Sequence, residues 1–319
     1  MNGVVRTLMR TVEELKGLGH ETKVFSPDLF RNLPCPTYSE IRLAVLPARR
    51  LAAMLDSFQP CAIHIATEGP LGHAARRYCL ARRLPFTTAF HTRFPEYIQA
   101  RTGLPLGASY TVLRRFHAPS SSVMVATPSL ERDLDGRGFR NLKRWTRGVD
   151  TTLFHPREKS FLDLPRPIHI YVGRVAVEKN VEAFLKLDLP GSKLVVGGGP
   201  QLADLKRRYP EVRFAGPRTG EDLARHYAAA DVFVFPSRTD TFGLVLLEAL
   251  ASGLPVAAYP VPGPIDVING SPVGFLNEDL ASAARNAASI SPGLCRDFAL
   301  QFSWRRSAEQ FLSNLKPFA

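Results

Sequence analysis

Short apolar runs alternate with amphipathic segments along most of the chain. Residues 4–18 place apolar side chains three or four positions apart, which predicts a helix that Gly17 and Gly19 bring to an end. The apolar runs that follow have the length and β-branched content of buried strands. We expect strands at residues 22–25, 62–66, 86–90 and 122–126. Strands and helices in this alternation predict a doubly wound α/β domain with a parallel sheet.

The second half of the chain starts the same pattern again. Its expected strands lie at residues 168–172, 193–196, 212–214, 232–235 and 256–259. We therefore expect two domains, residues 1–150 and 151–319, joined by a linker within residues 147–167, with a C-terminal helix at about 303–319 packing back on the first domain. Ligands of such sheets bind at the carboxyl ends of the strands, so two facing sheets predict an interdomain cleft.

The beginning of the chain departs from this pattern. A doubly wound sheet places its first strand centrally and before the first helix. Here Asn2, Gly3 and Val4 lead directly into a helical segment. We therefore expect the first strand of the N-terminal domain to be missing, through a wrongly chosen start methionine or a truncation.

Charge is distributed unevenly along the 319 residues, which carry a formal net charge of +12. Residues 1–150 contain 22 Lys and Arg against 12 Asp and Glu, whereas residues 151–319 contain 19 against 17. A basic first half predicts a polyanionic partner, either a nucleic acid or an anionic membrane surface. The alternative is a basic surface that serves solubility alone.

Two further classes of protein are disfavoured by composition. No apolar run approaches the ~18 to 20 residues that a membrane-spanning helix requires. The four cysteines are too widely spaced for a paired metal site and are expected to be reduced thiols in a cytosolic protein. They are Cys35, Cys61, Cys79 and Cys295.

The most informative segment runs from Val234 to Gly253 and predicts a buried strand, a polar loop and a helix. Asp240, Thr241 and Gly243 stand at the helix start, where unpaired N–H groups favour an anionic or hydroxylated ligand. Glu248 follows about 8 Å further along the helix, within an apolar run. Its carboxylate could accept hydrogen bonds from the vicinal hydroxyls of a ribose. The alternatives are that Asp240 is an N-cap and that Glu248 faces solvent.

Two glycine-containing loops follow other strands of the second half. Gly173, Arg174 and Lys179 place two cations on one loop, which suits a diphosphate, although such a pair could equally be solvated surface charge. Residues 197–200 read Gly-Gly-Gly-Pro, which predicts a tight turn that lets a ligand pass close. Their spacing does not fit G-x-G-x-x-G, so we do not expect a nicotinamide cofactor.

In the first half, polar residues follow two of the expected strands. Glu68 comes after residues 62–66, and His91 and Arg93 come after residues 86–90, so these side chains are expected near the cleft. A histidine in such a place can also be a structural hydrogen-bonding group. Asp133 and Asp135 form a D-x-D pattern in a helical segment with no strand directly before it, so we do not expect a metal site there.

Together these residues define a family resemblance that covers nearly the whole chain. The chain resembles the family 4 retaining glycosyltransferases of the GT-B type, in particular bacterial GDP-mannose-dependent α-mannosyltransferases and sulfolipid or glycolipid synthases. In combination the motifs are highly specific. They lie at residues 2–5, 90–92, 147–150, 173–179, 197–200, 235–237 and 240–248.

The resemblance implies a GT-B architecture with two Rossmann-like domains and a role for each matching residue. Arg174 and Lys179 would hold the donor diphosphate, Glu248 the ribose, and Asp240, the first carboxylate of the family's E-x7-E motif, the sugar hydroxyls. His91 would contact the transferred sugar. The remaining donor-binding positions would be Gly3, Gly173, Thr241, Phe242, Gly243 and Leu244, and the acceptor-side candidates are Asn2, Glu68 and Arg93. The family needs no metal and no cofactor other than its nucleotide sugar.

The sequence thus predicts transfer of a hexose, with the α configuration retained, from GDP-mannose or a UDP-hexose to a hydroxyl of a lipid or lipid-linked acceptor. The basic first domain predicts a peripheral enzyme on the inner face of the cytoplasmic membrane. One alternative is a non-catalytic or truncated nucleotide-sugar-binding remnant. The other is a basic nucleic-acid-binding protein, although no recognisable nucleic-acid module is present and no nucleic acid is expected as a partner.

Overall fold

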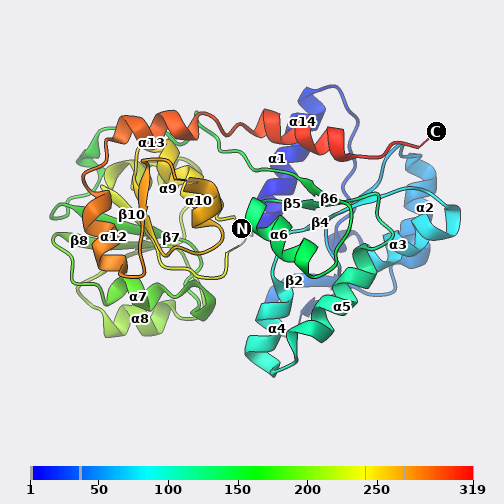
Figure 1. Cartoon of the computed structure of the whole chain (residues 1–319), viewed down its shortest axis with the longest axis horizontal. Coiled ribbons are helices and arrows are strands. Elements are labelled where there is room, and N and C mark those ends of the chain that lie inside the picture. The colour runs from blue at the N-terminus through cyan, green and yellow to red at the C-terminus, as the bar shows by residue number, and fades with distance from the viewer. Residues whose placement is uncertain (1–2, 36–37, 241, 269, 319) are drawn as a thin grey trace. The chain divides into compact units, whose positions relative to one another are not determined.

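The computed structural model describes residues 3–35, 38–240, 242–268 and 270–318. The chain divides into two compact units (Figure 1). Unit 1 comprises Met1–Thr146 together with Ala308–Ala319, and unit 2 comprises Arg147–Ser307. The boundary therefore lies after Thr146, four residues before the position expected from the sequence, and unit 1 is built from two separate stretches of chain.

Unit 2 contains a six-stranded parallel sheet. The first strand along the chain, β7, is central. The next two strands extend the sheet on one side and the last three on the other, which is the Rossmann strand order. In spatial order the strands are β12 (Gly274–Leu276), β11 (Val256–Ala258), β10 (Val232–Phe235), β7 (Ile168–Val172), β8 (Ser192–Val196) and β9 (Arg213–Gly216).

The strands β7 and β10 are buried along their whole length, as expected for strands covered by helices on both faces of a sheet. The helices of unit 2 surround this sheet (Figure 1). They are α7 (Val181–Leu185), α8 (Leu202–Arg208), α9 (Gly220–Ala229), α10 (Leu244–Ala251), α11 (Pro264–Ile268), α12 (Leu280–Ala287) and α13 (Pro292–Ala299).

Unit 1 contains a four-stranded parallel sheet of β3 (His64–Ile65), β4 (Thr87–Phe90), β5 (Ser122–Val125) and β6 (Leu142–Arg144), in that order. The helices of this unit occupy the intervening segments, and the final helix of the chain passes from unit 2 into unit 1. They are α1 (Gly3–Gly17), α2 (Ala48–Phe58), α3 (Pro70–Arg82), α4 (Phe94–Thr102), α5 (Leu106–His117), α6 (Pro128–Gly136) and α14 (Trp304–Asn314).

The strand predicted at residues 22–25 is wrong, because this segment joins no sheet. A strand needs a hydrogen-bonding neighbour, and β3 pairs with β4 alone among the described strands. An antiparallel hairpin of β1 (Asn32–Cys35) and β2 (Tyr38–Ala44), which the sequence did not predict, follows instead. The other predicted strands are present, whereas β6 and β12, each three residues long, were missed.

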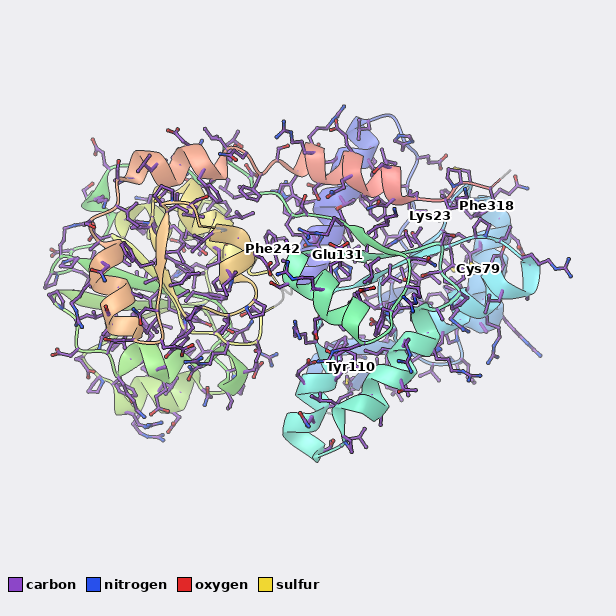
Figure 2. All side chains as sticks on the ribbon, viewed as in Figure 1. Lys23, Cys79, Tyr110, Glu131, Phe242 and Phe318 are labelled. Atoms are coloured by element: carbon purple, nitrogen blue, oxygen red, sulfur yellow. The ribbon has the colours of Figure 1, made fainter. Side chains whose placement is uncertain are left out.

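The C-terminal segment completes the core of unit 1. The rings of Trp145 and Phe311 lie 4.9 Å apart between centroids, and both side chains are buried. Asn314 Nδ2 donates to Arg144 O at 2.7 Å. Phe318 N donates to Cys61 O at 2.8 Å, and the Phe318 side chain packs in the cluster that contains Cys79 (Figure 2). None of the helices in the described ranges combines the length and apolar character needed to cross a bilayer.

Candidate functional site

The centre of the unit 2 sheet brings the predicted donor-binding residues to one edge. Because β7 and β10 are neighbours and the strands that follow them extend the sheet in opposite directions, their carboxyl ends form the switch point at which such sheets bind ligands. Gly173 and Arg174 follow β7 directly, and the polar loop that leads to α10 follows β10. Residues predicted from two separate motifs therefore occupy adjoining loops of the same unit.

Lys179 and Asp240 meet across these two loops. Lys179 Nζ forms an ion pair with Asp240 Oδ1, and both side chains are largely buried. Two further contacts tie the loops together: Asn180 Nδ2 donates to Pro236 O at 3.2 Å, and Thr239 Oγ1 donates to Glu178 O at 3.3 Å. Asp240 does not cap α10, since Gly243 occupies the N-cap position.

Arg174 lies on the same edge, with its side chain 35% exposed. Its carbonyl oxygen accepts a hydrogen bond of 2.8 Å from Tyr171 OH, which fixes the backbone where the loop leaves β7. Arg174 Nη1 lies 3.8 Å from Glu178 Oε1. Burial raises the pKa of Tyr171 well above its usual value, and the charges of Asp240 and Glu178 raise it further. Both carboxylates are therefore near this phenol, and Glu178 is a member of the site that sequence reasoning missed.

Two buried oxygen atoms on the loop after β10 lack a partner within the described part of the chain. They are Ser237 Oγ, on a fully buried side chain, and Asp240 Oδ2. Leaving such a group unsatisfied costs about 1–3 kcal/mol. A ligand that supplies hydroxyl or amide donors would relieve this cost. The resemblance included Ser237 in a motif without a role, because a serine in a loop gives no signal of its burial.

Glu248 is buried within α10, with 4% of its surface exposed. The alternative that it faces solvent is therefore wrong. Its Oε2 accepts a hydrogen bond of 3.0 Å from Tyr227 OH, a buried side chain on α9. Tyr227 was not predicted, because it lies 21 residues away on another helix. The carboxylate is thus held in a fixed orientation inside unit 2.

The start of α10 is shaped by glycine. Gly243 has φ +81°, and a methyl group added there would lie 3.1 Å from Leu246 Cδ1. Gly263, at φ +97°, lets another loop approach, since a methyl group there would lie 3.0 Å from Asp240 O. Phe242 precedes Gly243 and is largely buried (Figure 2). Leu244 begins the helix, and Thr241 lies outside the described residues.

The glycines after β8 allow the loop after β8 to contact the loop after β7. A methyl group at Gly197 would lie 1.8 Å from Gly173 O, and one at Gly199 would lie 2.3 Å from Val175 O. Val175 N also donates to Gly198 O at 2.9 Å. The sequence predicted a turn that admits a ligand, whereas the structure shows these glycines against the backbone of the loop that carries Arg174.

The candidates of unit 1 lie at strand ends as expected, but two of them are engaged in contacts within the unit. Glu68 Oε1 lies 3.1 Å from His117 Nε2. Arg93 Nη1 forms ion pairs with Asp133 at 2.8 Å and with Glu96 at 3.3 Å. The His91 ring lies 5.5 Å from the ring of Trp145, Gly3 begins α1, and Asn2 lies outside the described residues.

The first aspartate of the D-x-D pattern is occupied by arginines. Asp133 Oδ2 binds Arg93, and its Oδ1 lies 2.9 Å from Arg137 Nε. Within the ranges that the structure describes, no group of three His, Cys, Asp or Glu side chains is arranged to hold a metal ion.

Two family models match the chain. The model for "Glycosyl transferases group 1" matches residues 166–291, and the model for "Glycosyltransferase Family 4" matches residues 1–153. The first match spans most of unit 2, with the loops after β7 and β10, and the second spans the N-terminal part of unit 1.

Several curated proteins are similar over most of the chain. The sulfoquinovosyl transferase SQD2 of Arabidopsis thaliana is 32% identical, over 75% of this chain and 50% of the relative. A GDP-mannose-dependent alpha-mannosyltransferase of Mycobacterium tuberculosis is 31% identical, over 86% of this chain and 80% of the relative. An alpha-monoglucosyldiacylglycerol synthase of Streptococcus pneumoniae is 24% identical, over 98% and 80%. The chain therefore spans half of the first relative and four fifths of the other two.

Among solved structures, the Anabaena protein Alr3699/HepE in complex with UDP superimposes with a TM-score of 0.71. The match covers 98% of this chain and 95% of that protein, at 15% sequence identity. The likeness therefore concerns the fold.

Proposed function

Since the chain belongs to glycosyltransferase family 4 and has the GT-B fold, we propose that it transfers a hexose from a nucleotide diphosphate sugar to a hydroxyl of a lipid or lipid-linked acceptor, with retention of the α configuration. The observation that carries this proposal is the convergence of Lys179, Asp240 and Arg174 on the edge of unit 2 where β7 and β10 end. The name of the mycobacterial relative supplies GDP-mannose as one candidate donor, and a UDP-hexose is the alternative expected from the sequence.

Donor binding would exchange ionic partners at this edge. The donor diphosphate carries two negative charges and would draw the Lys179 ammonium away from Asp240, while Arg174 grips phosphate oxygens in a fork. Asp240 would then be available to accept hydrogen bonds from sugar hydroxyls. Ser237 Oγ and Asp240 Oδ2, both buried without a partner among the described residues, would gain ligand hydrogen bonds at the same time.

The buried Glu248 suits the ribose of the donor. A carboxylate accepts two hydroxyl hydrogen bonds at once, and the Tyr227 hydroxyl holds one of its oxygens in place. Phe242, Gly243 and Leu244, at the start of α10, would contribute backbone contacts close to the phosphate and the sugar.

In the proposed reaction, the bond from the anomeric carbon to the diphosphate oxygen breaks and a bond to the acceptor oxygen forms on the same face. The departing diphosphate takes the proton of the acceptor hydroxyl, so the enzyme supplies no nucleophile. The side chains of Arg174 and Lys179 stabilise the charge that develops on the leaving diphosphate, and this electrostatic effect is the main contribution of the protein.

The replacement Arg174→Ala tests the role of this cation. We expect turnover at saturating donor to fall by about 100- to 1,000-fold, because charge on the leaving group is then uncompensated. Arg218→Ala is the matched control, since Arg218 lies in the same unit in an exposed ion pair with Asp222. Turnover near the wild-type value in the Arg174 variant would refute the assignment.

Nucleotide binding separates a working enzyme from a non-catalytic remnant and identifies the base of the donor. Thermal-shift titrations with UDP and GDP should show stabilisation by one of the two, and radiolabel transfer from the corresponding nucleotide sugar should follow. Binding of a nucleotide would favour the remnant if neither transfer to a lipid extract nor hydrolysis of the donor were observed.

The proposed acceptor lies at a membrane, and the outer face of the hairpin β1–β2 supports this choice. Leu33 is 62% exposed and is paired with Leu43 across the hairpin, whereas Ala44 on the opposite face is buried. Leu46, in the following turn, is 92% exposed. An apolar surface bordered by cations suits the interface of an anionic bilayer. The exposed arginines of this segment are Arg31, Arg42, Arg49 and Arg50.

Sedimentation with vesicles of phosphatidylcholine and phosphatidylglycerol tests this membrane contact. We expect salt-sensitive binding that Leu46→Ser weakens about tenfold, because one leucine no longer enters the apolar layer. Leu300→Ser, at a half-exposed leucine of unit 2, is the control and should bind like the wild type. Absence of binding to anionic vesicles at low salt would exclude a membrane-bound acceptor.

A further inference from the structure

A chain of buried polar side chains lies behind Glu68 in unit 1. His117 Nε2 lies 3.1 Å from Glu68 Oε1, and His117 Nδ1 lies 2.9 Å from Thr88 Oγ1. Thr88 Oγ1 in turn lies 3.2 Å from Ser120 Oγ. Thr88, His117 and Ser120 are buried, and none of them was singled out in the sequence. This group of four side chains is called the Glu68 network below.

One hydrogen-bond direction in this network follows from the protons available. Ser120 Oγ lies 2.7 Å from His117 O, and a carbonyl has no proton, so Ser120 donates there. The single proton of the Thr88 hydroxyl lies within reach of Ser120 Oγ, Ser122 O and His117 Nδ1. When this proton goes to His117 Nδ1, the ring carries its own proton on Nε2, where it faces Glu68 Oε1.

The contact between His117 and Glu68 requires a proton, because an ionised carboxylate can only accept a hydrogen bond. A neutral imidazole protonated at Nδ1 presents a lone pair at Nε2, which would repel a carboxylate oxygen at 3.1 Å. The contact therefore contains a proton that the two groups share. Burial of the ring keeps water from replacing it, since the His117 side chain is almost fully enclosed.

The backbone next to Glu68 packs closely against the first turn of α3. Gly72, in the first turn of that helix, lies so close to the preceding loop that a methyl group there would be 1.9 Å from Thr67 O. Glu68 follows β3 and precedes the N-cap Gly69, so it stands at the carboxyl end of the sheet, where ligands of such sheets bind. Its side chain keeps 10% exposure, and no described residue bonds to Oε2.

We propose that His117 is a positioning residue for acceptor binding: the proton shared with Glu68 Oε1 holds this carboxylate so that Oε2 accepts a hydrogen bond from a hydroxyl of the acceptor. This inference rests on the proposed glycosyl transfer. It assigns Glu68 to the recognition of an uncharged, hydroxyl-bearing group, and it accounts for a buried histidine that the donor site does not use.

Two amide variants separate positioning from simple packing. Gln at position 117 can place a donor near Nε2 and so bond Glu68, whereas Asn can reach only toward Thr88. We expect His117→Asn to raise the KM for dioleoylglycerol in phosphatidylglycerol vesicles by about 10- to 100-fold, as for loss of a hydrogen bond to a charged group, and His117→Gln to restore most of the loss. The nucleotide-induced thermal shift should be the same in both. Equal KM values for the Asn variant and the wild type would overturn the proposal.

A spectroscopic measurement on the protein itself does not depend on the acceptor. The ¹⁵N shifts of the His117 ring, assigned by their loss in His117→Gln, should show Nε2 protonated, and Glu68→Gln should change the Nε2 signal. A neutral ring protonated only at Nδ1 would refute the proton assignment. Absence of nucleotide binding in the wild type would instead refute the proposed function, so the two failures are distinguishable.

Discussion

At the scale of single residues, Gly197 fixes the position of a charged side chain in another loop. A side chain at this position would collide with Gly173 O, one residue before Arg174. The loops after β7 and β8 also share the hydrogen bond from Val175 N to Gly198 O. The location of the Arg174 guanidinium thus depends on a backbone contact between residues far from each other in sequence.

The replacement Gly197→Ala should lower the free energy of unfolding by about 1–3 kcal/mol, because the methyl group forces the two loops apart. Urea denaturation measures this loss. The control is Gly293→Ala in α13, where the nearest atom to an added methyl group, Ser291 Oγ, lies at 3.6 Å. If the Gly197 variant is as stable as this control, the loops are not held by their contact.

The sequence predicts site residues well where one local segment carries them. Asp240 and Glu248 belong to a single strand, loop and helix, so their shared edge can be inferred from that pattern. The roles of Tyr227 and His117 could not be inferred from the sequence. Tyr227 is 21 residues away from the carboxylate that it contacts, and His117 is 49 residues away from its own. Burial of Ser237 Oγ likewise results from packing of distant segments.

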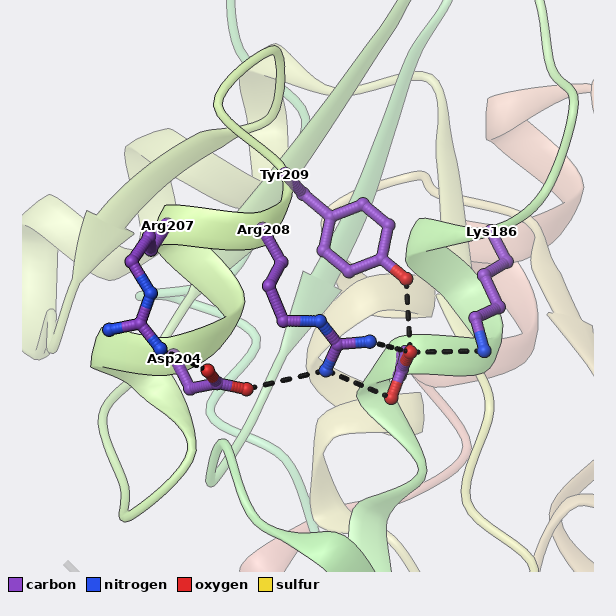
Figure 3. Close-up of polar contacts among 6 residues, drawn as sticks. Lys186, Asp204, Arg207, Arg208 and Tyr209 are labelled. Atoms are coloured by element: carbon purple, nitrogen blue, oxygen red, sulfur yellow. Dashed lines mark hydrogen bonds and ion pairs between the residues drawn. The ribbon is translucent and has the colours of Figure 1, made fainter.

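At the scale of elements, α7 and α8 are joined by a network of charges around Glu182 (Figure 3). Lys186 Nζ lies 3.0 Å from Glu182 Oε1, Tyr209 OH donates to the same oxygen at 3.1 Å, and Arg208 forms an ion pair with this carboxylate. Hydrogen bonds from Lys186 first, then from Arg208 and Tyr209, lower the pKa of Glu182 to about 2. Asp204 extends the network through ion pairs with Arg207 and Arg208.

This pKa gives the network a defined pH dependence. The folded-state pKa lies below that of an ordinary glutamate, so the stabilisation is present above about pH 4.5 and is lost as the pH falls toward 2. Urea unfolding of the wild type and Glu182→Gln should therefore differ at pH 6 and converge as the pH falls below 4.5. Glu13→Gln, at a more exposed ion pair in α1, is the control. A difference that stays constant with pH would contradict the assigned shift.

Elements could be predicted where a continuous apolar run is as long as a buried strand. The strands β7, β8 and β10 are such runs, and all three are where the sequence placed them. The segment 22–25 has only two apolar residues, Val24 and Phe25, and finds no partner strand among the described residues. The edge strand β12 was missed because a run of three residues is too short to indicate a strand.

At the scale of the whole molecule, unit 1 depends on a segment that follows unit 2 in the chain. Phe311 and Ala308 pack with Trp145, Met124 and Leu15 in one buried cluster. Gln310 Oε1 accepts from Thr146 N at 2.7 Å, so the segment also satisfies the backbone at the unit boundary. The family resemblance gave the two-domain organisation, whereas this cluster becomes visible only in the structure.

The replacement Phe311→Ala should destabilise unit 1 by about 3–5 kcal/mol, because a buried aromatic ring is removed from the cluster. Hydrogen exchange measured by mass spectrometry should show faster exchange in β4 and β5, with β7 and β10 unchanged. Phe275→Ala, at a partly exposed ring of unit 2, is the control. Uniform acceleration across both sheets would mean that the two units unfold together.

The split composition of unit 1 also has a consequence for protein synthesis. The ribosome releases residues 308–319 only after all of unit 2, so the middle of the polypeptide can fold while its beginning still waits for Phe311. During that interval the side chains of Trp145 and its neighbours are exposed to solvent and can be bound by chaperones. Nascent chains stalled just before residue 308 should therefore be more sensitive to protease in their first 146 residues than in the part that was translated later.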